Sequence, residues 1–336
     1  MALRIVVLGM GGRGRSWLRV VQQEHNVELA AIVDPDPARL ARAAADFHVP
    51  QSSCFSTLAE AVAKTSPDAA LIVTPNVLHE EHLHECLDRG LHILCEKPLV
   101  MHREAGCDIL AKATQKGLAV IAVQNYRWNP GILTLRQLIA EGAVGEPTSC
   151  LVDFHRLRPI HGMPYPLLYN QAIHHLDAAR WIFGCNAVSV IARSWNPPWH
   201  DCDGDTMIEA TYEMENGVIF HYSGNYATRG EDTPYSGIWR IECAQGSISF
   251  MGDAEVHVTI RRREKPPEEV PPVAAGRSGD SHLLASLVAA VQHNEPAPTA
   301  VQDNLHSLEM IWSATESDKT GRKVNLSRFS AQLPLN

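Results

Sequence analysis

The sequence predicts two domains, a doubly wound α/β domain followed by a domain built on a mostly antiparallel sheet. The chain has 336 residues, about twice the size of a typical single domain. Up to residue 123, short apolar runs alternate with segments of helical periodicity, which is typical of a parallel sheet with helices on both faces. After residue 123, strand-like runs joined by Gly, Asn and Asp turn signals dominate, as in an antiparallel sheet.

In the first domain, five apolar runs have the length of strands. They are LRIVVL (3–8), ELAAIV (28–33), ALIVTP (70–75), HILCEK (92–97) and AVIAV (119–123). Each is followed by amphipathic material. Strand and helix therefore alternate in the order that builds a parallel sheet.

In the second domain, a helix is expected at about 130–141 and ends at Gly142. Seven strand-like runs follow, at 148–157, 188–195, 206–214, 218–226, 239–244, 246–251 and 256–262, interrupted by a helix at about 172–183. The Pro-rich, charged segment 265–281 reads as a surface loop. Two helices, at 282–291 and about 301–319, are expected to close the chain.

Composition excludes several classes of protein. The 45% hydrophobic and 20% charged residues are typical of a globular protein and not of a disordered one. A net charge of -9 without a block of basic residues makes nucleic acid an unlikely partner. No apolar run approaches the length of about 18 residues that a membrane span needs. Eight cysteines without a CxxC pair indicate reduced thiols in the cytoplasm and no structural zinc site.

A glycine motif directly after the first strand is the strongest functional signal. Residues 9–14 read GMGGRG and match GxGxxG. In such a motif glycines permit a tight turn, the approach of a pyrophosphate to the backbone, and close packing of the next helix, whose N-terminus faces the phosphates. Asp34, at the end of the second strand, is placed to accept hydrogen bonds from a ribose and to repel a 2′-phosphate, so NAD is favoured over NADP. Arg13 and Arg39 are the residues that leave NADP open.

Two polar clusters follow later strands of the first domain. Thr74-Pro75-Asn76 with His79 follows the third run, and Glu96-Lys97-Pro98 follows the fourth. The carboxyl ends of parallel strands are where open α/β sheets bind ligands. A helix entry and an exposed strand exit are the structural alternatives for these two clusters.

Taken together, these motifs and three later segments resemble the Gfo/Idh/MocA oxidoreductases. The later segments are NYRWNPG (125–131), NQAIHHLD (170–177) and the closing SATESDKTGRKVNL. The resemblance implies a Rossmann domain at 1–123, and a substrate-binding and oligomerisation domain at 124–336 built on a large, open, mostly antiparallel sheet. It also implies that the helix at about 301–319 packs back on the Rossmann domain. A sugar-like or polyol-like substrate is expected between the domains.

The resemblance assigns catalytic roles. Lys97 is implied to reach the reacting oxygen, Glu96 to lie near the nicotinamide ribose, and His174 to act as acid and base. The family's aspartate, four residues before that histidine, is Asn170 here. Because a neutral amide stabilises an imidazolium less than a carboxylate does, His174 is expected to be a weaker base than in a typical member. The change fits a different substrate pose, a reductive direction, or loss of dehydrogenase activity.

We therefore expect an NAD(P)-dependent oxidoreductase acting on a sugar, polyol or related hydroxy compound. The alternatives are an NAD-retaining glycoside hydrolase or lyase and a non-catalytic NAD-binding regulator. An apolar, open sheet face would be buried in a homodimer or homotetramer. The expected catalytic residues are Lys97, His174 and Asn170; the cofactor-binding residues are Gly9, Gly11, Gly12, Arg13, Gly14, Asp34, Thr74, Pro75, Asn76, His79, Glu96, Lys97 and Asn125; the substrate residues are Lys97, Arg127, His155, Tyr165 and His174; no metal ligands are expected.

Overall fold

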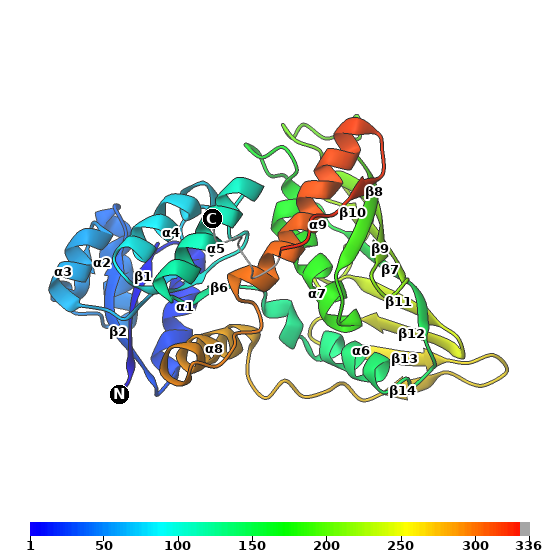
Figure 1. Cartoon of the computed structure of the whole chain (residues 1–336), viewed down its shortest axis with the longest axis horizontal. Helices are drawn as coiled ribbons and strands as arrows, with labels where there is room; N and C mark the ends of the chain where they lie inside the picture. Colours follow the sequence, from blue (N-terminus) through cyan, green and yellow to red (C-terminus); the bar gives the residue numbers. More distant parts are fainter. Residues whose placement is uncertain (330–336) are drawn as a thin grey trace. The chain divides into compact units, whose positions relative to one another are not determined.

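The computed structural model describes residues 1–329, which form two compact units (Figure 1). The first unit contains Met1–Val123 and Asp280–Leu305, and the second contains Gln124–Gly279 and His306–Phe329. The first unit is therefore discontinuous in sequence, because the chain returns to it after building most of the second. Among residues 1–329, none of the helices combines the length and the apolar character that crossing a membrane requires.

The first unit is built on a parallel sheet of six strands, in the order β3-β2-β1-β4-β5-β6. Its strands are β1 (Leu3–Leu8), β2 (Val27–Val33), β3 (Cys54–Phe55), β4 (Ala69–Ile72), β5 (His92–Cys95) and β6 (Val120–Ala122). The order reverses between β1 and β4, which is the switch point of a doubly wound sheet. The predicted α/β class is confirmed, while β3, with two residues, is too short to have been expected from an apolar run.

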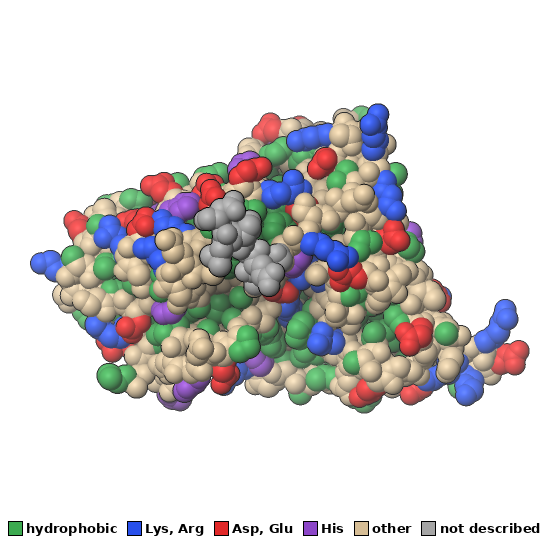
Figure 2. Space-filling view, viewed as in Figure 1, with side chains coloured by type: hydrophobic (Ala, Val, Ile, Leu, Met, Phe, Trp, Pro, Cys, Tyr) green, Lys and Arg blue, Asp and Glu red, His purple; other side chains and the backbone are tan. Residues whose placement is uncertain are grey.

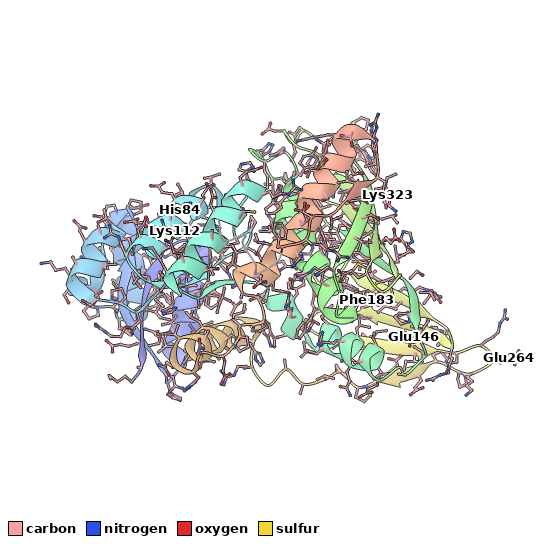
Figure 3. The ribbon with its side chains drawn as sticks, viewed as in Figure 1. His84, Lys112, Glu146, Phe183, Glu264 and Lys323 are labelled. Atoms are coloured by element: carbon pink, nitrogen blue, oxygen red, sulfur yellow. The ribbon has the colours of Figure 1, made fainter. Side chains whose placement is uncertain are left out.

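Capping residues mark the ends of some helices of the first unit. The helices are α1 (Gly12–Gln23), α2 (Pro37–Phe47), α3 (Leu58–Thr65), α4 (His79–Asp88), α5 (Arg103–Lys116) and α8 (Gly279–His293). The Asp36 carboxylate accepts hydrogen bonds from the first turn of α2, and Gly117 ends α5 in the left-handed conformation. In Figure 3, Lys112 of α5 and His84 of α4 lie close together, and the ammonium of Lys112 is 3.4 Å from the carbonyl oxygen of His84.

The second unit contains a sheet of nine strands, in the order β14-β13-β12-β11-β7-β10-β9-β8-β15. Its strands are β7 (Pro147–His155), β8 (Ala187–Trp195), β9 (Met207–Met214), β10 (Ile219–Asn225), β11 (Ile238–Cys243), β12 (Gly246–Met251), β13 (His257–Arg261), β14 (Glu268–Val270) and β15 (Val324–Asn325). All the neighbouring pairs are antiparallel except β7 with β10. The mostly antiparallel sheet is confirmed, but β14 lies within the segment that was expected to be a loop.

Helices cover one face of this sheet (Figure 1). They are α6 (Pro130–Ala140), α7 (Ile173–Phe183) and the part of α9 (Val301–Thr320) that belongs to the second unit. A Cβ atom on Gly131 of α6 would lie 2.2 Å from the Phe250 ring of β12, so glycine allows the helix to approach the strand. The Tyr212 hydroxyl of β9 donates to the Met310 carbonyl oxygen of α9 at 3.1 Å. Alternate residues of the strands are therefore buried.

The surface charges are mixed. On the face shown in Figure 2, Lys and Arg side chains are interspersed with Asp and Glu side chains and form no continuous stripe. This face therefore lacks the basic track that binding along a nucleic acid backbone needs.

A buried ion pair joins two segments of the second unit. Arg127 lies in a short 3-10 helix, Asn125–Trp128, and donates to both carboxylate oxygens of Asp177 in α7 at 2.7 Å. Their side chains are 3% and 1% exposed. The Ser307 hydroxyl also donates to the Asp177 carboxylate, at 2.7 Å. Arg180 of α7 also lies 3.6 Å from this carboxylate, so two buried guanidinium groups depend on Asp177 for compensation of their charge.

We expect Asp177→Asn to lower the stability of the chain by about 3 to 5 kcal/mol, because it leaves the Arg127 guanidinium buried without its counter-charge. The measurement is the denaturation midpoint, followed by tryptophan fluorescence. Arg42→Ala is the control, because the Arg42–Asp46 pair is exposed and such pairs contribute about 0 to 1 kcal/mol. An unchanged midpoint for Asp177→Asn would contradict the structural role of the pair.

Candidate functional site

A cavity of about 800 Å³ opens at the carboxyl ends of β1, β2 and β4 in the first unit. Its volume is in the range of small-molecule and cofactor sites. The lining includes seven of the expected cofactor residues, Gly9, Gly11, Gly12, Arg13, Asp34, Thr74 and Pro75. It also includes Leu8, Val33, Pro35, Arg39, Ser56, Thr57, Leu58, Ala59, Val73, Leu78, His82 and Glu85.

The glycine loop forms one wall of this cavity for steric reasons. Gly9 has a φ of +96°, and a Cβ atom there would lie 2.7 Å from the Val73 carbonyl oxygen. A Cβ atom on Gly14 would lie 1.9 Å from the Gly9 carbonyl oxygen, so α1 can pack this closely only without a side chain. At Gly11 and Gly12 a Cβ atom would meet no atom within 4 Å. The loop thus leaves open space in front of the α1 N-terminus, which fits a pyrophosphate.

Asp34 lies where the ribose of a dinucleotide is expected. Its side chain is 3% exposed and lines the cavity. One carboxylate oxygen accepts from the backbone N–H of Met10 at 2.7 Å, and the other from that of Asp36 at 2.9 Å. The carboxylate therefore joins the glycine loop to the end of β2 and puts a negative charge at the cavity wall.

Both arginines that left NADP open have carboxylate partners. The Arg39 guanidinium lies 3.3 Å from the Asp36 carboxylate and 4.0 Å from that of Asp34. Arg13 donates to both oxygens of Asp280 in α8, at 2.7 and 2.8 Å, and to Glu96 at 2.5 Å. Carboxylates thus offset the positive charge of each arginine that could attract a 2′-phosphate.

The Glu96-Lys97-Pro98 segment follows β5. The Glu96 carboxylate accepts from the indole of Trp17 at 2.8 Å as well as from Arg13, so it is held against α1. Lys97 comes next and is half-buried. Glu96 and Lys97 are not among the residues that line the cavity.

His79 connects the two polar segments that follow β4 and β5. It is fully buried, and its ring nitrogens lie 2.7 Å from the Pro98 carbonyl oxygen and 3.0 Å from that of Thr74. Burial lowers the pKa of His79, and the two carbonyl contacts oppose that shift. His82 is the histidine that lines the cavity, with Nδ1 3.0 Å from the Thr74 hydroxyl. Asn76 begins the 3-10 turn Asn76–Leu78 before α4.

His174 lies on α7 in the second unit and is 6% exposed. Its ring stacks on that of Tyr126, with centroids 4.4 Å apart and planes at 10°. Its Nδ1 lies 3.1 Å from the amide oxygen of Gln124. Asn170 is half-buried in a π-helix, Leu168–Ala172, directly before α7. Such π-turns are frequent at functional sites.

The remaining expected residues lie on the second unit, and three of them contact carboxylates. Asn125 begins the 3-10 helix that carries Arg127, and Arg127 itself is bound to Asp177. His155 Nε2 lies 2.6 Å from an Asp153 oxygen. The buried Tyr165 donates its hydroxyl to Asp318 of α9 at 3.2 Å. Among the described residues, no three His, Cys, Asp or Glu side chains are grouped so as to hold a metal ion.

Several site residues escaped the sequence reasoning. The segment Ser56–Ala59 follows β3, and Thr57 caps α3 by accepting from the N–H of Glu60 at 3.3 Å. The T-x-x-E pattern of a capping box was a usable signal there. Gln124 and His82 carried no local signal, because their roles depend on residues that only the fold brings near.

Comparison with known proteins agrees with the fold of the two units and with an NAD-binding domain in the first. Residues 3–124 match a family model described as "Oxidoreductase family, NAD-binding Rossmann fold", and residues 132–249 match the GFO/IDH/MocA C-terminal domain. An uncharacterized protein of Sinorhizobium fredii is 28% identical over 98% of this chain and 97% of its own. An inositol 2-dehydrogenase of Corynebacterium glutamicum is 34% identical over 65% of each chain.

Solved structures share the fold. An oxidoreductase from Agrobacterium radiobacter, in complex with NAD+, L-tartaric acid and magnesium, superposes with a TM-score of 0.86 at 19% identity, over 97% of this chain and 98% of that one. Aldose-aldose oxidoreductase from Caulobacter crescentus, complexed with glycerol, gives a TM-score of 0.84 at 19% identity, over 97% and 100% of the two chains.

The parallel sheet, the glycine loop and the cavity, together with the family match of residues 3–124, identify an NAD-binding oxidoreductase. Within that class, the chain belongs to the Gfo/Idh/MocA family, as its motifs indicated.

We expect Asp34→Asn to lower the preference for NADH over NADPH by about tenfold or more, because it removes one negative charge, worth roughly 1.4 kcal/mol, from the wall of the cavity. Fluorescence titration of each reduced cofactor gives the two Kd values. Asp46→Asn is the control, because Asp46 is an exposed carboxylate on α2 that does not line the cavity. An unchanged ratio for Asp34→Asn would show that this charge does not select the cofactor.

Proposed function

We propose that this chain transfers a hydride between NAD and a carbon that bears a hydroxyl group on a sugar, polyol or related compound. The observation that carries the proposal is a glycine-walled cavity with a buried aspartate at its edge, in a member of an oxidoreductase family. Relatives named inositol 2-dehydrogenase, D-apiose dehydrogenase and aldose-aldose oxidoreductase support a polyhydroxylated substrate.

The residues of the first unit would hold the cofactor by complementary charge and shape. The open space before α1 accommodates the pyrophosphate, and Asp34 accepts hydrogen bonds from the ribose hydroxyls. The Asp34 charge and the carboxylates around Arg13 and Arg39 favour NAD over NADP. When bound, NAD supplies the hydride acceptor or, reduced, the hydride donor.

Two side chains carry the proton and charge changes at the substrate. Lys97 holds the reacting oxygen, because an ammonium group stabilises the negative charge that develops as the hydroxyl loses its proton. His174 takes that proton in the oxidative direction and returns it in the reductive one. The neutral Asn170 donates or accepts a hydrogen bond and adds no charge.

The experiment incubates the purified protein with NAD+ and pools of sugars, polyols and inositols, and follows absorbance at 340 nm, about the maximum of the reduced nicotinamide. Cofactor reduction by one pool confirms the proposal and leads to the substrate.

We then expect Lys97→Met to lower kcat by about a hundredfold or more, since charge stabilisation at the reacting oxygen is lost. Lys64→Met is the control, because Lys64 is an exposed lysine on α3 that does not line the cavity. Full turnover by Lys97→Met would refute the assigned role, and product formation without cofactor reduction would point to a hydrolase or lyase.

We further infer a homodimer or homotetramer in a reducing compartment. The sheet face of the second unit opposite its helices carries the apolar side chains Leu151, Ile191 and Met251, which are 44%, 53% and 47% exposed. Burial of these side chains against another copy would remove them from water. The eight cysteines, all within the described residues, form no disulfide, which fits the cytoplasm.

Light scattering of the purified chain at micromolar concentration is expected to give at least the mass of a dimer. Leu151→Lys should shift the distribution toward a monomer, because a charge on that face opposes its burial. Gln137→Lys is the control, because Gln137 is exposed on α6, which packs on the other face of the sheet. A monomer in the unmodified protein would contradict the inference.

A further inference from the structure

Gln124 is a buried amide whose oxygen contacts His174. It lies two residues after the end of β6, is 0% exposed, and its Oε1 lies 3.1 Å from Nδ1 of the imidazole. An amide oxygen only accepts hydrogen bonds. The imidazole must therefore carry its hydrogen on Nδ1, which leaves the lone pair of the neutral ring on Nε2.

Tyr126 fixes the plane of the same ring. The two rings are stacked at 4.4 Å. The Tyr126 hydroxyl accepts from the Gln171 amide at 2.8 Å, and the same Gln171 nitrogen donates to the Tyr235 carbonyl oxygen at 2.8 Å. The imidazole is therefore held in its plane by a stacked ring and in its rotation by Gln124.

We propose that Gln124 is a positioning residue that selects the tautomer of His174, so that Nε2 is the atom that exchanges the substrate proton. This inference rests on the proposed function, in which His174 is the acid and base. Asn170 stands where the family resemblance implies an aspartate. The chain therefore has no carboxylate at residue 170 to orient His174, and the neutral amide of Gln124, after β6, contacts the ring instead. The Gln124 amide nitrogen is buried and has no hydrogen-bond partner in the described part of the chain.

Several ionised side chains that act on Tyr126 or lie on α6 and next to α7 have partners of their own. Arg127 is bound to Asp177, and Arg136 of α6 lies over the Trp181 ring. The guanidinium of Arg156 lies 3.7 Å from the centre of the Tyr235 ring. Asp253 accepts from the backbone N–H groups of Tyr235 and Ser236.

Two further titratable rings lie close to this cluster. His175 contacts the Tyr222 hydroxyl and the Tyr235 carbonyl oxygen, and burial lowers its pKa to about 4. Burial raises the pKa of Tyr126 to about 12. Both rings are therefore neutral near pH 7, and a carboxylate introduced at residue 124 would be a new charge beside His174.

The tautomer is tested without substrate or cofactor. Long-range proton–nitrogen NMR of histidine-labelled protein reports which ring nitrogen carries the hydrogen, and the signals of His174 are identified by their loss in His174→Gln. We expect a protonated Nδ1 and an unprotonated Nε2 in the unmodified protein. In Gln124→Leu we expect a mixture of tautomers, because the acceptor is removed. The opposite tautomer in the unmodified protein would overturn the proposal.

Kinetics test the consequence once a substrate is known. Gln124→Leu should lower kcat by about a hundredfold with little change in the KM for NAD, because proton transfer is impaired while the cofactor cavity is intact. Gln124→Glu restores an acceptor and adds a charge that favours the imidazolium. The acid limb of its pH–rate profile should therefore move to higher pH by about one pH unit or more, and kcat should be near normal at pH values above that limb.

Gln137→Leu, an exposed change on α6, is the control and should leave kcat unchanged. Thermal melting of every variant separates misfolding from misorientation. A folded Gln124→Leu with normal kcat, or a Gln124→Glu profile that does not move, would refute the role of Gln124. If no substrate is found, the proposed function fails, and the NMR result still decides the tautomer.

Discussion

The arrangement of the second unit around His174 depends on the ion pair between Arg127 and Asp177. Three residues before Arg127 lies the amide that contacts the histidine, and three residues before Asp177 lies the histidine itself. The pair therefore clamps the 3-10 helix against α7 at the point where a small shift would separate Gln124 from His174. Both side chains are buried. Loss of one charge would therefore leave the other without solvation by water, which is strongly destabilising.

In the first unit, the corresponding constraint is steric. The loop between β1 and α1 passes so close to the end of β4 that a side chain at Gly9 would collide with the Val73 backbone, and α1 packs so close to the loop that a side chain at Gly14 would collide with the Gly9 backbone. The Met10 N–H of this loop lies 2.7 Å from the Asp34 carboxylate, so the residue expected to bind the ribose also braces the loop expected to bind the phosphates. The same carboxylate is thus expected to serve both cofactor binding and the geometry of the glycine loop.

Most of the fold was predictable, because buried parallel strands appear as apolar runs and half-buried antiparallel strands as alternation. The glycine loop and Asp34, which line the cavity, were predicted from local motifs. His174 was implied by the family resemblance, and its role stays a prediction. What could not be found depends on long-range contacts: Arg13 meets Asp280 across 267 residues, and Gln124 meets His174 across 50. Three short strands, β3, β14 and β15, were missed because two or three residues show no periodicity. The π-turn at Leu168–Ala172 has no sequence signature in a helical segment.

The discontinuity of the first unit has a consequence for biosynthesis. Thr299 pairs with Ala122 through its backbone and its hydroxyl, at 2.9 and 2.8 Å, so the segment 280–305 closes the β6 edge of the parallel sheet. During translation, β6 emerges from the ribosome long before that segment, and at roughly 5 to 20 residues per second the edge stays open for many seconds. The β6 edge of the nascent parallel sheet therefore stays unpaired while the second unit is synthesised. Its final closure is a late event on the ribosome or after release.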